Sequence, residues 1–177
     1  MKPRVVAAAI ASLTTLALLV SCSSSSPDAS GQADRANPPA THALRDVPLP
    51  DLTGMSPSVQ QQLRDQAADL SRLAAAKAPP DQRATAFGEM GKLLLAVESF
   101  ADAEACFLNA SELNPSDSRW DYYLGHVYRS QGQSGKAAAY FERTLKARPD
   151  DVAALVWLGN AYLDQGRAVE AGPLFAR

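Results

Sequence analysis

The order of hydrophobic and polar positions divides the chain into three parts. Val5 to Val20 form an unbroken uncharged run. From Ser23 to Gly54 the chain is rich in Ser, Pro, Asp and Gly, and apolar residues show no regular spacing. From Val59 onward they return at steps of three and four, which is the spacing of one face of an α-helix. The pattern predicts an apolar leader, a flexible connecting segment and a helical folded part.

The folded part is expected to begin with one amphipathic helix inside residues 54–80. Ser56 can cap this helix, Pro57 suits its first turn, and Pro79 and Pro80 end it. The apolar stripe consists of Val59, Leu63, Ala67, Leu70 and Ala74. A lone helix must bury such a stripe, and the following segment is the expected place.

That following segment repeats itself every 34 residues. The matching columns are Gly91, Gly125 and Gly159; Ala103, Ala137 and Ala171; Phe107, Phe141 and Phe175; and Pro115 and Pro149. A 34-residue period with these residues resembles the tetratricopeptide repeat, a helix–turn–helix unit. The resemblance covers Ala84 to Arg177, as repeats 84–117 and 118–151 and a partial third at 152–177. It implies an all-α helix-turn-helix solenoid over residues 81–177, preceded by the amphipathic helix and a disordered tether.

The repeated residues have packing roles in this fold. Glycine on the first helix and alanine on the second let the two backbones approach closely, and phenylalanine fills the space between helices. Gly132 and Gly166 end the first helices, and Pro115 and Pro149 end the second. The first repeat carries Glu98 where the turn glycines stand, so we expect a looser turn there.

The N-terminal run matches a secretory signal peptide, because Lys2 and Arg4 precede it and it is short for a membrane span, which needs about 20 residues. Its end, Leu19-Val20-Ser21-Cys22, resembles the lipobox of bacterial lipoproteins. The resemblance implies cleavage of residues 1–21, acylation of Cys22, and a flexible tether over 22–53. An ordinary signal peptide with a chance cysteine is the alternative. In a Gram-negative host, Ser23 in place of aspartate favours the outer membrane, facing the periplasm.

Composition excludes several function classes. Lys+Arg 17 against Asp+Glu 19 gives no concentrated basic charge for nucleic acid. Two cysteines and two histidines are too few for a metal site or a disulfide scaffold, and Cys106 is expected to be a buried structural thiol. His42 falls in the tether and should be solvated. With no nucleophile beside a His and acid set, no phosphate loop and no dinucleotide motif, we expect neither an enzyme, a cofactor nor a small-molecule substrate.

The resemblance also implies a concave face, lined by the first helices, that binds an extended peptide or a partner helix. By column, its inward positions are Thr85, Gly88, Lys92, Leu95, Arg119, Tyr122, His126, Arg129, Val156, Asn160 and Leu163. The candidate partner-binding residues are Lys92, Arg119, Tyr122, His126, Arg129 and Asn160. Arginine beside an aromatic is typical of binding hot spots. Ordinary solvated positions are the competing interpretation.

These features predict a lipid-anchored periplasmic scaffold whose partner is a protein or peptide of the cell envelope. Two alternatives stay open: a dedicated pilus, secretin or cell-wall assembly factor, or the front of a longer protein whose C-terminal domain could be catalytic. The chain stops inside the second helix of its third repeat. We therefore expect Leu155, Leu158 and Leu163 to form an uncovered face, completed by more chain or by another chain.

Overall fold

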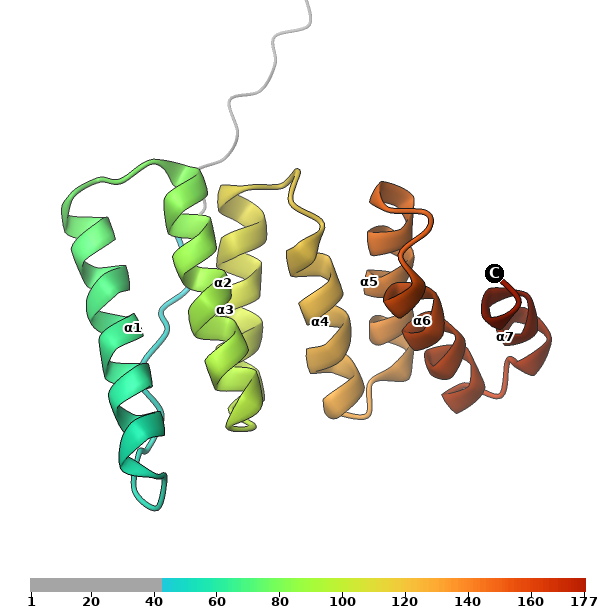
Figure 1. Cartoon of the computed structure of the whole chain (residues 1–177), viewed down its shortest axis with the longest axis horizontal. Helices are drawn as coiled ribbons and strands as arrows, with labels where there is room; N and C mark the ends of the chain where they lie inside the picture. The colour runs from blue at the N-terminus through green and yellow to red at the C-terminus, as the bar shows by residue number, and fades with distance from the viewer. Residues whose placement is uncertain (1–42) are drawn as a thin grey trace, which may run out of the picture. The chain divides into compact units, whose positions relative to one another are not determined.

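The computed structural model describes residues 43–177, which form seven α-helices and no strand in that range (Figure 1). The helices are α1 (Pro57–Ala75), α2 (Pro80–Ala96), α3 (Phe100–Leu113), α4 (Arg119–Ser130), α5 (Ser134–Ala147), α6 (Val152–Asp164) and α7 (Ala168–Phe175). Each packs chiefly on its neighbours in sequence, as a row of helix pairs. The predicted all-α repeat solenoid is confirmed. The predicted leader, Cys22 and His42 lie outside the described residues.

Glycine and phenylalanine interlock within each helix pair. A Cβ built on Gly91 would lie 2.8 Å from the Phe107 ring, and one on Gly125 would lie 2.6 Å from the Phe141 ring. In the third pair, the corresponding distance from Gly159 to the ring of Phe175 is 2.5 Å. These distances are shorter than a real Cβ contact, so each ring occupies the volume that a larger residue would need. Ala103, Ala137 and Ala171, on the second helices, are fully buried.

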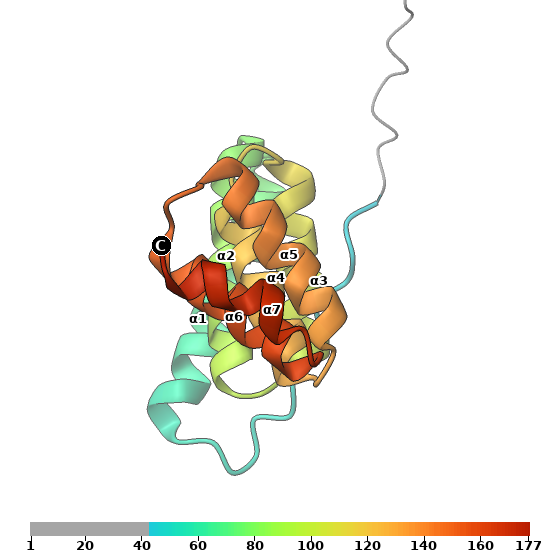
Figure 2. The same cartoon turned by 90° about the vertical axis from the view of Figure 1, so that its right-hand side faces the viewer.

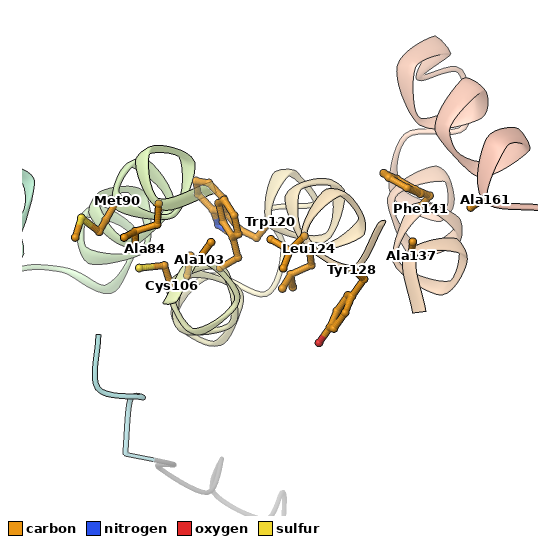
Figure 3. Close-up of a cluster of buried hydrophobic side chains, with 14 of the residues drawn as sticks. Ala84, Met90, Ala103, Cys106, Trp120, Leu124, Tyr128, Ala137, Phe141 and Ala161 are labelled. Atoms are coloured by element: carbon orange, nitrogen blue, oxygen red, sulfur yellow. The ribbon is translucent and has the colours of Figure 1, made fainter. Parts of the chain in front are cut away.

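Hydrophobic side chains form one continuous core through the stack (Figure 3). Leu63 on α1 begins it, Met90 on α2 and Cys106 on α3 continue it, and Trp120 and Leu124 on α4 extend it into the second repeat. A core that passes from repeat to repeat is the physical basis of a solenoid, since no single helix pair can bury its own apolar face.

The turns between first and second helices use a left-handed residue. Gly132 has φ 71° and Gly166 has φ 75°. Around Gly132 the backbone forms two hydrogen bonds, from Gly132 N–H to Arg129 O at 2.9 Å and from Gln133 N–H to Tyr128 O at 2.8 Å. This is the Schellman pattern that satisfies the last carbonyls of a helix.

The first repeat forms the same turn without glycine. Glu98 adopts φ 60°, and its N–H donates to Leu95 O at 3.1 Å while Ser99 N–H donates to Leu94 O at 2.9 Å. The expectation of a looser turn is therefore wrong, because the two hydrogen bonds hold the glutamate in the conformation that glycine takes elsewhere. The Cβ of Glu98 makes this left-handed conformation sterically less favourable than it is for glycine.

Helix α1 packs against α2 at the N-terminal end of the stack. The Ser56 hydroxyl accepts a hydrogen bond from the Val59 amide at 3.5 Å, and Pro57 is the first helical residue. Leu63 is fully buried, and Ala67 and Leu70 pack against the core with partial exposure. Most of the stripe expected from the sequence thus covers this end of the stack, whereas Ala74 is exposed.

The residues before α1 form a packed strap, defined here as residues 45–55, that runs beside α3 (Figure 2). The buried Asn109 side chain binds the Arg45 backbone twice: its Oδ1 accepts from Arg45 N–H at 2.8 Å, and its Nδ2 donates to Arg45 O at 2.9 Å. Arg45 also pairs with Glu112 at 3.2 Å, and Val47 and Leu52 pack on the core. The tether predicted over 22–53 therefore needs correction: from Arg45 onward, main-chain hydrogen bonds and apolar contacts hold the segment.

The last helix pair differs from expectation in which leucines it exposes. Leu155 and Leu158 are buried within the stack, whereas Leu163 is 47% exposed. The predicted uncovered face is wrong for the first two, because α6 packs between α5 and α7. Apolar exposure in this pair falls instead on Val152, Val156 and Leu163 of α6 and on Val169 and Phe175 of α7, of which Val169 is 91% exposed.

Candidate partner-binding face

The predicted inward positions of α4 share one helical face, at steps of three and four. They are Arg119, Tyr122, His126 and Arg129. The structure divides them into two kinds, since Arg119 and Arg129 are exposed while Tyr122 and His126 are half-buried. The patch expected as one polar surface is thus partly a packing contact.

Four rings form an aromatic cluster that joins the second and third repeats: Tyr122 and His126 of α4, Phe141 of α5 and Trp157 of α6. The His126 ring centroid lies 4.6 Å from Tyr122, 5.0 Å from Trp157 and 5.4 Å from Phe141. All three contacts are edge-to-face, the arrangement that aromatic quadrupoles favour. His126 is therefore a half-buried packing residue.

Burial controls the charge of the cluster. Desolvation, aided by the positive charge of Arg129, lowers the pKa of His126 to about 4. Burial also raises the pKa of the Tyr122 hydroxyl. Both side chains are thus neutral at neutral pH, and Arg129 is the cation that acts on His126.

Arg129 contacts this cluster through the face of the Trp157 ring. Its guanidinium carbon is 4.4 Å from the centre of the Trp157 ring, within the range of a cation–π interaction. The side chain is exposed and forms no ion pair within residues 43–177. Trp157 was not among the sequence candidates. The sequence does place Trp157 next to the inward position Val156, as an aromatic residue. Its counterpart one repeat earlier, Tyr123, instead stacks on Phe107 in the core.

Helix α6 continues the surface with apolar residues. Val156 is 40% exposed, Leu163 is 47% exposed, and Asn160 between them is partly exposed. Steps of four and three place the three on one face of the helix. We call Arg129, Val156, Trp157, Asn160 and Leu163 the groove patch.

The remaining cations predicted for this face are already paired. Arg119 holds Asp117 through its Nε at 2.9 Å and Nη2 at 2.6 Å, and this hydrogen bonding lowers the pKa of the Asp117 carboxyl. Lys92 pairs with Glu89 at 2.5 Å. Neither offers an unbalanced charge to a partner.

Gly88 is not a surface position. A Cβ on it would lie 2.1 Å from the Trp120 ring, which is buried between the first two repeats. The tryptophan thus fills the place that the repeat pattern assigns to an inward-facing side chain, and the first repeat contributes little open surface here.

Neither a metal-binding cluster nor an ionised thiol occurs in the described part of the chain. No group of three or more His, Cys, Asp or Glu side chains there is arranged to hold a metal ion. Burial raises the pKa of the Cys106 thiol to about 12, so this buried sulfur stays protonated. Among residues 43–177, no helix combines the length and hydrophobicity that a membrane crossing requires.

Comparisons with known proteins agree with this architecture. The family model described as tetratricopeptide repeat matches residues 89–143 and 124–177, which together span half of the chain. A search of curated proteins gives no match. A crystal structure of MamA protein is 22% identical, with a TM-score of 0.52, over 67% of this chain and 72% of that chain. The MamA structure designated MSR-1 C2 is 20% identical, with a TM-score of 0.56, over 68% of this chain and 65% of that one. These likenesses concern the fold. On the family match and the helix-pair geometry together, the chain belongs to the tetratricopeptide repeat family.

Proposed function

We propose that this chain is a non-catalytic scaffold that binds a segment of another protein on the groove patch. Membership of the tetratricopeptide repeat family supports a role in protein–protein interaction. The observation that carries the proposal is the exposed Arg129 stacked on Trp157 beside the exposed Val156 and Leu163. Arginine and tryptophan are enriched at the energetic centres of interfaces.

Physical reasons favour this surface over the rest of the concave face. Covering Val156 and Leu163 would gain roughly 25 cal/mol for each Å² of apolar surface removed from water. The ring contacts already fix Trp157, and Trp157 in turn fixes Arg129, so binding costs little side-chain entropy. An extended peptide and a partner helix both suit a surface of this kind.

Recovery of a bound protein from detergent-solubilised membranes tests whether the groove patch binds a partner. We expect the wild-type full chain to retain a stoichiometric envelope protein and Leu163→Asp to lose it, because a carboxylate would be buried in the apolar contact. Val169→Asp is the matched control, since Val169 is an exposed aliphatic on α7 outside the patch. Equal recovery by both variants would contradict the proposal, as would no recovery at all. A single partner would favour a dedicated assembly factor over a general scaffold.

We further propose that the scaffold is anchored in the cell envelope through a lipidated Cys22, at the outer membrane and facing the periplasm. The support is the order of Lys2, Arg4, the uncharged run and Leu19-Val20-Ser21-Cys22. Two or three acyl chains would make membrane attachment nearly permanent. Cys22→Ser should release the protein or leave an unprocessed precursor, and the wild type should incorporate labelled fatty acid. Absence of label in the wild type would refute the anchor.

A further inference from the structure

Charge on the concave face is unbalanced at one place. Lys92 and Arg119 are neutralised by Glu89 and Asp117. On α6, the face of Val156, Asn160 and Leu163 has no charged residue. The acid that ends this helix, Asp164, forms no ion pair with Arg129. One positive charge therefore stands next to an apolar surface without a partner among the described residues.

The stacking of Arg129 determines what it can bind. The guanidinium carbon of Arg129 lies over the indole ring at 4.4 Å, and the planar group carries its N–H donors around its edge in a rigid fork. That edge fits a carboxylate, which can accept two parallel hydrogen bonds from it. The neighbouring His126 is neutral and adds no second cation to attract a more highly charged group.

We infer that the groove patch binds a protein segment that presents an acidic side chain to Arg129 and an aliphatic side chain to Val156 and Leu163. The inference rests on the proposed function and adds the chemistry of the partner. The acid supplies orientation, because only one place on the patch is charged. The aliphatic residue supplies burial. Asn160 lies between Val156 and Leu163 and can bind the main chain of the segment with its amide.

Fluorescence anisotropy with designed peptides tests this chemistry on the full chain. The probes are labelled peptides of alternating leucine and glutamate, and the same peptides with glutamine or lysine in place of glutamate. We expect the glutamate peptide to bind wild type about tenfold more tightly than the glutamine peptide, which is the usual scale of a hydrogen bond to a charged group. The lysine peptide should bind most weakly.

Substitutions at Arg129 test whether its charge gives the preference for the glutamate peptide. Arg129→Gln should remove the preference for glutamate, and Arg129→Lys should keep part of it, because the charge remains while the forked geometry is lost. Arg167→Gln is the matched control, since Arg167 is also stacked on an aromatic ring, that of Tyr162 at 3.9 Å, but at the turn before α7. It should keep the full preference.

The outcomes distinguish this inference from the function on which it rests. Equal binding of the glutamate and glutamine peptides by wild type would overturn it, as would a preference that survives in Arg129→Gln, or no binding of any peptide. In each of those cases, loss of the envelope partner in Leu163→Asp alone would still support the scaffold. A glutamate preference that depends on Arg129 supports both.

Discussion

At the scale of single residues, His126 is a predicted binding residue that the structure places in a packing contact. Three aromatic rings surround its imidazole and Arg129 lies nearby, so the charged form loses solvation and meets a like charge. The cluster is therefore stable only while the imidazole is neutral. This gives the joint between the second and third repeats a dependence on pH.

His126 should destabilise the fold as the solution is acidified. Its folded pKa of about 4 lies below the ordinary 6.5, so the unfolded chain takes up the proton first. The stability it contributes is fully present above about pH 6.5 and is lost as pH falls toward 4. His126→Asn, which copies Asn160 of the third repeat, should reduce the fall in melting temperature over that range in circular dichroism. Parallel curves for the two proteins would contradict the assignment.

Glu98 is a residue whose replacement should stabilise the protein. It holds φ 60° where its counterparts are glycine, and a left-handed residue with a Cβ costs about 1 kcal/mol. Glu98→Gly should therefore raise the free energy of unfolding by about 0.5–1 kcal/mol in urea denaturation. Gly132→Ala, the control at the equivalent turn, should lower it by a similar amount. A loss of stability in Glu98→Gly would show that its side chain contributes more than its backbone costs.

At the scale of elements, the helix pairs depend on glycines that leave room for a ring. The three pairs share this contact, but the exposure of the ring differs among them. Phe141 is fully buried between α4 and α5, whereas Phe175 is 46% exposed at the end of α7. The same substitution should thus have different consequences in different repeats.

Gly125→Ala should destabilise the protein, and Gly159→Ala should be nearly neutral. A new Cβ at Gly125 would lie 2.6 Å from a fully buried ring, at an overpacking cost of about 1–3 kcal/mol, offset by about 1 kcal/mol of better helix propensity. At Gly159 the ring of Phe175 can swing outward, so the gain in propensity offsets most of the cost. Urea denaturation of both variants measures the difference. Equal losses would contradict this account of the contact.

The strap is the second element whose role can be measured. Asn109 is fully buried and binds both backbone polar groups of Arg45. Asn109→Ala leaves these groups without partners, which should cost about 1–3 kcal/mol and free the strap from α3. Hydrogen exchange should then accelerate at the Arg45 amide while the amides of α4 to α6 stay protected. Unchanged exchange at Arg45 would show that apolar contacts alone hold the strap.

At the scale of the whole molecule, the sequence predicted the repeat architecture because its contacts recur. The Gly–Phe contact recurs three times at a 34-residue spacing, so the same packing can be recognised in three places of one sequence. The turn at Glu98 escaped this rule, since backbone hydrogen bonds there override the preference of the side chain.

The candidate site was less predictable, because its contacts do not recur. The column rule placed Tyr122, His126 and Gly88 on an open surface, but Trp157 covers the histidine and Trp120 covers the glycine. Both tryptophans come from the next repeat, so their effect depends on how repeats stack. The strap likewise depends on a contact between Arg45 and Asn109, which lie 64 residues apart. Spacing within one repeat does not reveal such contacts.

At the scale of the whole molecule, the proposed binding surface lies on the second and third repeats. Trp120 fills the inward position at Gly88 of the first repeat, Lys92 and Arg119 are ion-paired, and the groove patch spans the second and third repeats. A partner should therefore be held at α4 and α6. Second helices, such as α5, should be free of it.

Photo-crosslinking in cells tests this claim most directly. A photo-reactive amino acid is placed in the full chain at Asn160 in the groove patch, or at the exposed Ala139 on α5 as the control. We predict a discrete crosslinked protein from position 160, none from position 139, and loss of the product when Leu163→Asp is added. The same products from both positions, or none from position 160, would contradict the proposal that the groove patch is the binding surface.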